Sequence, residues 1–276
     1  MAMKMEITKT DFERSILVAT SSHSEVFDSV EPHFEEVYNR LQQQFLGYVG
    51  ESALEASERL CEAVVKAVCL GAFLEVVRHL DLVLTPTGFG VVSNGEVSPA
   101  SSSRVEQLIE QCRVAYIRAE GEMLTWLTAT KGWGESEQAQ QSILMLVYTY
   151  DQYSFQTKRQ LTSQQWNDQL AALTDADATL RRLISDEQVD DFLLMERGAK
   201  ERDSISGTVI FRLRRMQILL AENLMTAYAN ERARLLNFMD QFIEKFPIYA
   251  HSSAYKANHF KEFNNEKSKP AYVFNA

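Results

Sequence analysis

Carboxylates at helical spacing are the residues of this sequence best suited to chemistry. Glu58 and Glu62 stand four residues apart, so they share one face of a predicted helix. Paired carboxylates transfer protons in catalysis or hold a divalent cation. Arg59 and Lys66 lie beside them, and the sequence contains no Glu-x-x-His motif of the kind that di-iron bundles use. The pattern therefore favours a solvated helix face over an active site.

Two tyrosines form the other group with chemical potential. Tyr148 and Tyr153 fall in one predicted helical segment, residues 136–159. A cleft lined by Glu58, Glu62 or these tyrosines would suit an enzyme or a ligand-binding helical protein. The sequence contains no GxSxG motif and no serine or cysteine in a recognisable nucleophile elbow. We therefore predict a protein that is not an enzyme and that has no catalytic residue, and we keep the cleft as an alternative.

Histidine and cysteine give no sign of a metal site. None of the five histidines stands in an HExxH motif, and no cysteine–histidine pair has zinc spacing. The three cysteines, Cys61, Cys69 and Cys112, are an odd number, which argues against a disulfide framework. We expect them to fill a reduced apolar core, and we predict no metal and no cofactor.

Basic residues are outnumbered by acidic ones. The net charge is −10, from 28 lysines and arginines against 38 aspartates and glutamates. Such a chain repels nucleic acid and anionic membranes, so neither is expected as a partner, except nucleic acid within a larger assembly. Arg212 and Arg215 lie three residues apart on a predicted helix. We name them as a candidate cluster for phosphate binding or for ion pairs along the helix face.

Apolar residues recur at helical spacing along most of the chain, while glycine (11) and proline (5) are scarce. These features predict a mainly α fold, a bundle of about seven to eight helices. The longest periodic segment, residues 204–246, predicts one very long C-terminal helix, on the order of 60 Å if unbroken. That length requires a coiled-coil-like partner or a kink, for which Asn223 and Asn230 are candidates.

One segment departs from helical spacing. Residues 82–98 combine β-branched residues with several glycines, and Asn94-Gly95 is the strongest two-residue signal for a hairpin turn. We predict a small β-hairpin here, with a further turn near Pro86–Gly88. Its candidate protein-contact residues are Thr85, Thr87, Phe89, Val91 and Asn94.

The chain ends in a polar segment that carries aromatic residues. We predict that residues 248–276 are extended or disordered, as in a tail that lies on another protein. The candidate contact residues in this tail are Tyr249, Tyr255, Phe260, Phe263, Tyr272 and Phe274. The predicted organisation is an N-terminal helical half over residues 1–134, a C-terminal half over residues 135–247, and this tail. The two halves can also form a single domain.

Two stretches carry a resemblance to a known group of proteins. The segment DLVLTPTGFGVVSNGEVSPAS (residues 81–101) and the ending from FPIYAHSSAYKANHF to KPAYVFNA (residues 246–276) resemble an uncharacterised family encoded by phages and prophages of Bacteroidetes. The resemblance implies a helix, a hairpin and a further helical half in this order, and it supplies no catalytic residue. More loosely, the chain is similar to the helical head–tail connector subunits that form rings below a phage portal.

These observations lead to one functional hypothesis and two alternatives. We expect a non-enzymatic structural or assembly protein, a connector-like ring subunit that contacts other protein subunits through Thr85–Val97 and Ile248–Ala276. The partners can be further copies of the chain, and we expect a cytoplasmic location, or a place in the virion if the chain is phage-derived. The alternatives are the enzyme or ligand-binding protein described above and a helical regulatory adaptor.

Overall fold

The computed structural model describes residues 6–16, 25–80, 82–85, 88–91 and 101–260. These residues are mainly helical, as predicted. The helices of the first half are α1 (Lys9–Ser15), α2 (Glu25–Val30), α3 (Phe34–Leu41), α4 (Gly47–Ala53), α5 (Glu58–Val76) and α6 (Ser102–Thr128). Those of the second half are α7 (Glu137–Ser142), α8 (Tyr150–Thr157), α9 (Ser163–Ile184), α10 (Asp186–Glu196), α11 (Ser204–Ala221), α12 (Met225–Gln241), α13 (Pro247–His251) and α14 (Ser253–Asn258).

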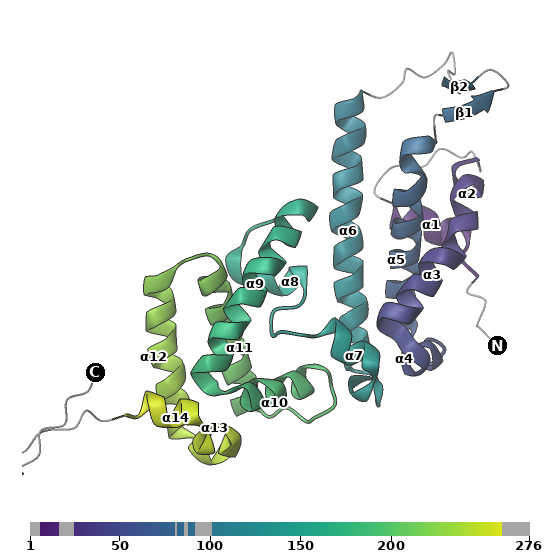
Figure 1. Ribbon diagram of the computed structural model, residues 1–276. Coiled ribbons are helices and arrows are strands. Elements are labelled where there is room, and N and C mark those ends of the chain that lie inside the picture. The colour runs from purple at the N-terminus through teal and green to yellow at the C-terminus, as the bar shows by residue number, and fades with distance from the viewer. Residues whose placement is uncertain (1–5, 17–24, 81, 86–87, 92–100, 261–276) are drawn as a thin grey trace, which may run out of the picture.

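Shorter elements join these helices. A π-helical turn spans Gln42–Leu46, and 3-10 turns span Glu31–His33, Val77–His79, Trp133–Glu135 and Ile243–Lys245. Two strands, β1 (Leu82–Thr85) and β2 (Gly88–Val91), lie between α5 and α6. In Figure 1, α1 to α6 gather on the right and α8 to α14 on the left, with α7 at the lower end of α6. Among the described residues, no helix combines the length and the apolar character needed to span a membrane.

The right-hand group is built around α5, whose sequence is apolar on most of its surface. Its side chains from Leu60 to Phe73 pack against α3, α1 and α6. Gly71 permits the closest of these approaches: a Cβ at this position would lie 2.8 Å from Val37 Cγ1 and 3.1 Å from Tyr116 Cε2. A helix buried on several sides therefore needs glycine at the point where its neighbours come nearest.

The two groups of helices are joined by a connector, residues 143–149, that is neither helix nor strand. Buried backbone groups require hydrogen-bond partners, and here side chains supply them. The Ile143 carbonyl accepts from Arg197 Nη2 at 2.6 Å, and the Leu146 carbonyl accepts from Arg214 Nε at 2.9 Å. The Val147 N–H donates to Gln217 Oε1 at 3.1 Å. Helices α10 and α11 thereby fix the path of the connector.

The predicted very long C-terminal helix is wrong. The chain turns between α11 and α12, which pack against each other as a pair (Figure 1). Asn223 adopts the left-handed conformation with φ of 57°, which asparagine tolerates better than most residues. The Leu224 N–H then donates to the Leu219 carbonyl at 2.8 Å and closes the end of α11. The apolar stripe of residues 204–246 continues because both helices face the same core.

The predicted extended tail is also wrong at its start. Residues 247–258 form α13 and α14, and the Tyr249 side chain is fully buried. Its backbone N–H donates to Gln188 Oε1 at 3.1 Å, and its ring meets Tyr255 edge-on at 5.3 Å. Pro247 begins α13, where a missing amide hydrogen costs little. The rest of the predicted tail, residues 261–276, lies outside the described residues.

The β-hairpin predicted over residues 82–98 is not seen in that form. The structure has a shorter ladder, in which β1 and β2 pair antiparallel with Leu82 opposite Val91 and Thr85 opposite Gly88. This ladder ends before Asn94-Gly95, and residues 92–100 lie outside the described part of the chain. A short loop costs less entropy to close than a long one, which favours pairing of β1 with the first strand-forming run after it.

We predict that Gln217→Leu lowers the free energy of unfolding by about 3 kcal/mol. The side chain is fully buried, accepts from the Val147 N–H, and donates to the Leu173 carbonyl at 3.0 Å. The substitution leaves both buried groups unpaired, and each such loss costs about 1–3 kcal/mol. Urea denaturation measures the change, with Gln140→Leu at an exposed site of α7 as a control expected within about 0.5 kcal/mol of the wild type. A change below about 1 kcal/mol for Gln217→Leu would show that the connector does not depend on this side chain.

Candidate functional site

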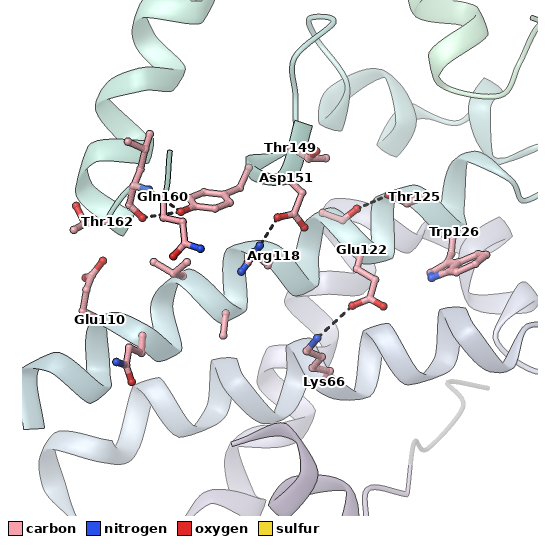
Figure 2. Close-up of a pocket in the computed structure, with 16 residues that line it drawn as sticks. Lys66, Glu110, Arg118, Glu122, Thr125, Trp126, Thr149, Asp151, Gln160 and Thr162 are labelled. Carbon is pink, nitrogen blue, oxygen red and sulfur yellow. Dashed lines mark hydrogen bonds and ion pairs between the residues drawn. The ribbon is translucent and has the colours of Figure 1, made fainter. Parts of the chain in front are cut away.

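A central groove of about 830 Å³ runs along α6. Its floor is α6, Lys66 of α5 lies on one side, and the start of α8 with residues 160–162 lies on the other (Figure 2). Two ion pairs cross it: Lys66 Nζ lies 3.3 Å from Glu122 Oε2, and Arg118 Nε lies 2.8 Å from Asp151 Oδ1. These pairs tie α6 to α5 and to α8. All four side chains are about half exposed, and such pairs contribute only about 0.2–1 kcal/mol each.

Aromatic side chains line both ends of the central groove. The Arg118 guanidinium carbon lies 5.6 Å from the centre of the Tyr150 ring, and that of Arg59 lies 5.0 Å from the Trp126 ring. The Tyr150 hydroxyl donates to the Leu161 carbonyl at 2.9 Å and accepts from the Leu161 N–H at 2.7 Å. The groove thus offers aromatic rings and exposed ion pairs whose charged groups a ligand can contact. This combination suits a small polar ligand.

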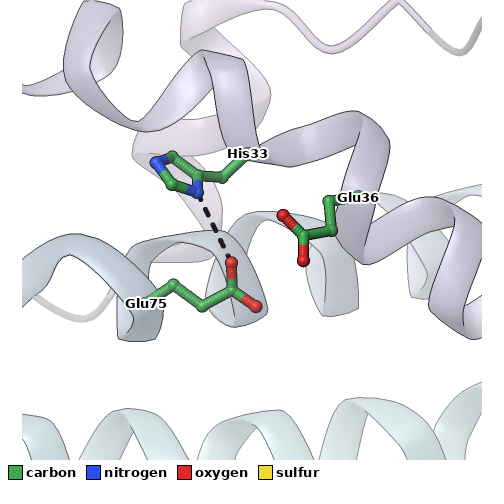
Figure 3. Close-up of side chains that lie close together, drawn as sticks. All are labelled: His33, Glu36 and Glu75. Carbon is green, nitrogen blue, oxygen red and sulfur yellow. Dashed lines mark ion pairs between the residues drawn. The ribbon is translucent and has the colours of Figure 1, made fainter.

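A second cluster, His33, Glu36 and Glu75, brings three potential metal ligands within 4.8 Å of one another. Figure 3 shows His33 facing Glu75, with 3.5 Å between Nδ1 and Oε2. The other oxygen of Glu75 accepts from Arg40 Nη2 at 2.8 Å. A guanidinium at this distance neutralises the carboxylate and repels a second cation. The arrangement is therefore one of ion pairs, and we do not assign a metal to it.

A series of partly buried polar side chains continues from this cluster into α6. Arg40 also donates to the Tyr116 hydroxyl, which in turn donates to Glu120 one helical turn further along. Burial raises the pKa of Glu120 to about 7, against an ordinary value of 4.5, although the bond from Tyr116 and the charge of Arg40 oppose the shift. The side chains of α3, α5 and α6 are thus joined by one chain of hydrogen bonds that contains a titrating carboxyl group.

Large apolar side chains are exposed around a third site, which we call the aromatic groove. It holds about 560 Å³ between the end of α8 and the outer face of α11. The apolar residues Phe155, Phe211 and Leu224 are 66%, 48% and 53% exposed. Its lining includes Phe155, Lys158, Arg159, Phe211, Arg215, Glu222 and Leu224.

Cations outnumber acids at the rim of the aromatic groove. Lys158 Nζ lies 4.3 Å from the centre of the Phe155 ring, and Arg159 Nη1 lies 2.6 Å from Glu222 Oε2. Glu222 also accepts from the Tyr153 hydroxyl. Arg215 is 55% exposed and stands 3.8 Å from Glu231. Three cations therefore surround an exposed apolar floor, with the carboxylates of Glu222 and Glu231 beside two of them.

The sequence did not predict the aromatic groove. The apolar stripe that we followed through residues 204–246 includes Val209 and Leu213, and Phe211 lies off that stripe. An aromatic residue that lies off the apolar face of a predicted helix is the sequence signal that could have indicated an exposed contact surface. Phe155 gives the same signal two residues after the buried Tyr153.

The predicted Arg212 and Arg215 cluster faces the carboxylate of Glu231, which is buried between α11 and α12. Arg212 Nη1 lies 2.6 Å from Glu231 Oε1, and Arg215 Nε lies 3.8 Å from Oε2. The sequence suggested either phosphate binding or ion pairing for Arg212 and Arg215, and these distances are those of ion pairs. Arg212 also lies over the Phe238 ring at 5.9 Å, so it belongs to the packing of the helix pair.

The predicted contact residues of the hairpin and the tail are distributed as follows. Thr85, Phe89 and Val91 lie in β1 and β2, while Thr87 and Asn94 lie outside the described residues. Tyr249 belongs to the core, and the Tyr255 ring stacks on His259 at 4.0 Å. Phe260 is 60% exposed. Phe263, Tyr272 and Phe274 lie outside the described part.

The residues of the alternative cleft are not brought together around either groove. Glu58 and Glu62 are exposed on α5, whereas Tyr153 is buried against Trp166 at 6.0 Å. Tyr148 lies in the connector and interacts with Arg214. The lining of the central groove includes none of these four residues. Cys69 and Cys112 are buried, and burial raises the pKa of the Cys69 thiol to about 12.

Comparison with known proteins gives one match. Residues 30–143 match a family of unknown function, DUF6712. The match covers less than half of the chain and runs from the end of α2 to the start of the connector. It supports a domain of uncharacterised function in this part. Neither curated proteins nor solved structures give a match.

We predict that the stability of the protein falls between about pH 4.5 and pH 7 because of Glu120. Its pKa is higher in the folded state than its ordinary value, so the folded state binds more protons in this window and loses stability as the pH rises. Glu120→Gln should remove about 2 kcal/mol of the difference in unfolding free energy between pH 5 and pH 8. Urea denaturation at both pH values measures it. Glu122→Gln, at an exposed position on the same helix, should leave the difference unchanged, and equal effects of the two substitutions would contradict the assignment.

Proposed function

We propose that this protein is a non-enzymatic structural or assembly protein that works by contacting other protein subunits. The observation that carries this proposal is the exposure of large apolar side chains at the aromatic groove and at Tyr48, which is 84% exposed. A soluble monomer seldom leaves several neighbouring aromatic and aliphatic side chains in water, and such patches are typical of interaction sites. Aromatic residues are also the usual anchors of protein interfaces.

The finer proposal is a ring subunit of the head–tail connector kind, from a phage or prophage. A closed ring is built from heterologous contacts, so each subunit needs two different surfaces. The described residues offer two such surfaces of unlike chemistry, the cation-rimmed aromatic groove and the acidic surroundings of Tyr48. The resemblance of residues 81–101 and 246–276 to phage-encoded proteins supports the same proposal. Residues 85–97 and, from the predicted tail 248–276, residues 261–276 remain the predicted additional contact segments.

The central groove favours one competing function, the binding of a small ligand. Its volume and its aromatic and carboxylate lining fit that role. A thermal-shift screen tests it, since a ligand at 100 times its dissociation constant adds about 2.7 kcal/mol of stability. A stabilising compound whose effect disappears in Arg118→Gln, in a chain that remains monomeric, would favour ligand binding over assembly.

We predict that the full chain forms a discrete multimer of its 31.5 kDa subunit in light scattering over a concentration series. A chain ending at Phe260 should need at least tenfold more protein for half-assembly, because it lacks the predicted contact segment 261–276. The cut belongs there and not after Phe246, since residues 247–258 form α13 and α14 on the core. A full chain that stays at 31.5 kDa at every concentration would contradict the proposed function.

A further inference from the structure

We propose that the aromatic groove receives the α4 corner of a second copy of the chain. The α4 corner is formed by the exposed residues Tyr48, Ser52 and Glu55 and the half-buried Glu51, on α4 and in the turn that follows it. This inference rests on the proposed function and assigns the two surfaces through which one subunit would hold the next.

The aromatic groove requires a partner with a large apolar side chain and negative charge. Its floor is apolar. Among its lining residues Lys158, Arg159 and Arg215 are cationic and Glu222 is acidic, and Arg215 also lies 3.8 Å from Glu231, which is not part of the lining. Glu222 is already engaged by Arg159 and by Tyr153. The net charge of the chain is −10, whereas this rim is locally positive. The rim therefore differs in sign from the molecule as a whole.

The α4 corner has the complementary chemistry. Tyr48 has the highest exposed fraction among the large apolar residues of the described chain. Glu51 lies one helical turn after Tyr48 on α4, and Glu55 lies in the turn that follows the helix, seven residues after Tyr48. Within the part of the chain that the structure describes, neither carboxylate forms an ion pair, and Glu51 accepts only a long bond of 3.4 Å from Tyr38.

The outer face of α11 is long enough to receive the corner. From Phe211 to Ala221, the last residue of α11, this face extends about 15 Å at 1.5 Å per residue, and from Tyr48 to Ala53, the last residue of α4, the helical part of the corner extends about 8 Å. The corner is also rigid: a Cβ on Gly50 would lie 2.8 Å from Leu127, so α4 sits directly on α6. A short, firmly held helical face with one projecting tyrosine fits a groove with an apolar floor.

The contact must be made between copies. Figure 1 shows α4 at the lower right of the molecule and the turn between α11 and α12 at the upper left. A corner at one end and a groove at the other form a head-to-tail contact, which generates a closed ring or an open filament. The segment 261–276 is a poorer occupant, because three lysines and two glutamates give it a positive charge like that of the groove.

The test uses light scattering on variants in which only exposed residues change. Phe155→Ser with Lys158→Glu disables the groove, and Tyr48→Ser with Glu55→Lys disables the corner. We expect each double variant to need at least tenfold more protein than the wild type for half-assembly. Leu144→Ser, at a leucine that is 64% exposed and belongs to neither surface, is the matched control and should assemble like the wild type.

Mixing the two double variants gives the sharper result. Each keeps one intact surface, so a 1:1 mixture should form a dimer of twice 31.5 kDa that goes no further. If both variants assemble like the wild type, this pair of surfaces is wrong while the proposed function stands. If the wild type itself stays monomeric, both fail. Two monomeric variants that form no dimer on mixing would also overturn the head-to-tail contact.

A nucleic acid is the competing occupant of a cationic groove with exposed aromatic rings. Fluorescence anisotropy with a labelled single-stranded oligonucleotide tests it in the same buffer. We expect no binding by the wild type at the concentrations where it assembles. Binding that is lost in Phe155→Ser with Lys158→Glu, with no change in assembly, would overturn the proposal.

Discussion

The fold depends on how buried side chains satisfy the backbone of residues 143–149. This connector crosses the interior without the hydrogen bonds that a helix or a sheet would provide, and an unpaired buried amide or carbonyl costs about 1–3 kcal/mol. Arg197, Arg214 and Gln217 supply partners from α10 and α11, and Gln152 accepts from the Tyr148 and Thr149 N–H groups at 3.0 and 3.3 Å. Two partly buried guanidinium groups, those of Arg197 and Arg214, are therefore hydrogen-bonded to peptide carbonyls of the connector.

The partial burial of these arginines imposes further requirements. Arg214 is balanced by Glu196, whose side chain is only 3% exposed and which also pairs with Arg202 at 2.8 Å. A buried charge without its partner is far more costly than the pair, so Glu196 and both arginines must be present together. Burial lowers the pKa values of Arg197 and Arg214. The position of α8, and with it one wall of each groove, follows from this single network.

The sequence predicted what depends on local periodicity. The mainly helical fold followed from apolar residues at helical spacing along most of the chain. The sequence did not predict the break at Asn223, because the apolar stripe of α11 and α12 continues through a turn that faces the same core. It also did not reveal the connector, whose polar partners lie 54 to 70 residues away in the chain. Those pairings exist only once the fold has formed.

The same limit explains why the exposed aromatic residues were not identified as a site. Phe155 and Phe211 come from helices about 50 residues apart, and each alone resembles an ordinary exposed apolar residue. Together with Lys158 and Arg215 they form one groove, because the connector and the ion network around Glu196 hold α8 near α11. Exposed aromatic side chains cost a monomer nothing in stability but raise its tendency to associate, so their position over a rigid support favours a specific contact over general stickiness. An assembly surface on this protein is thus a consequence of how its interior satisfies hydrogen bonds.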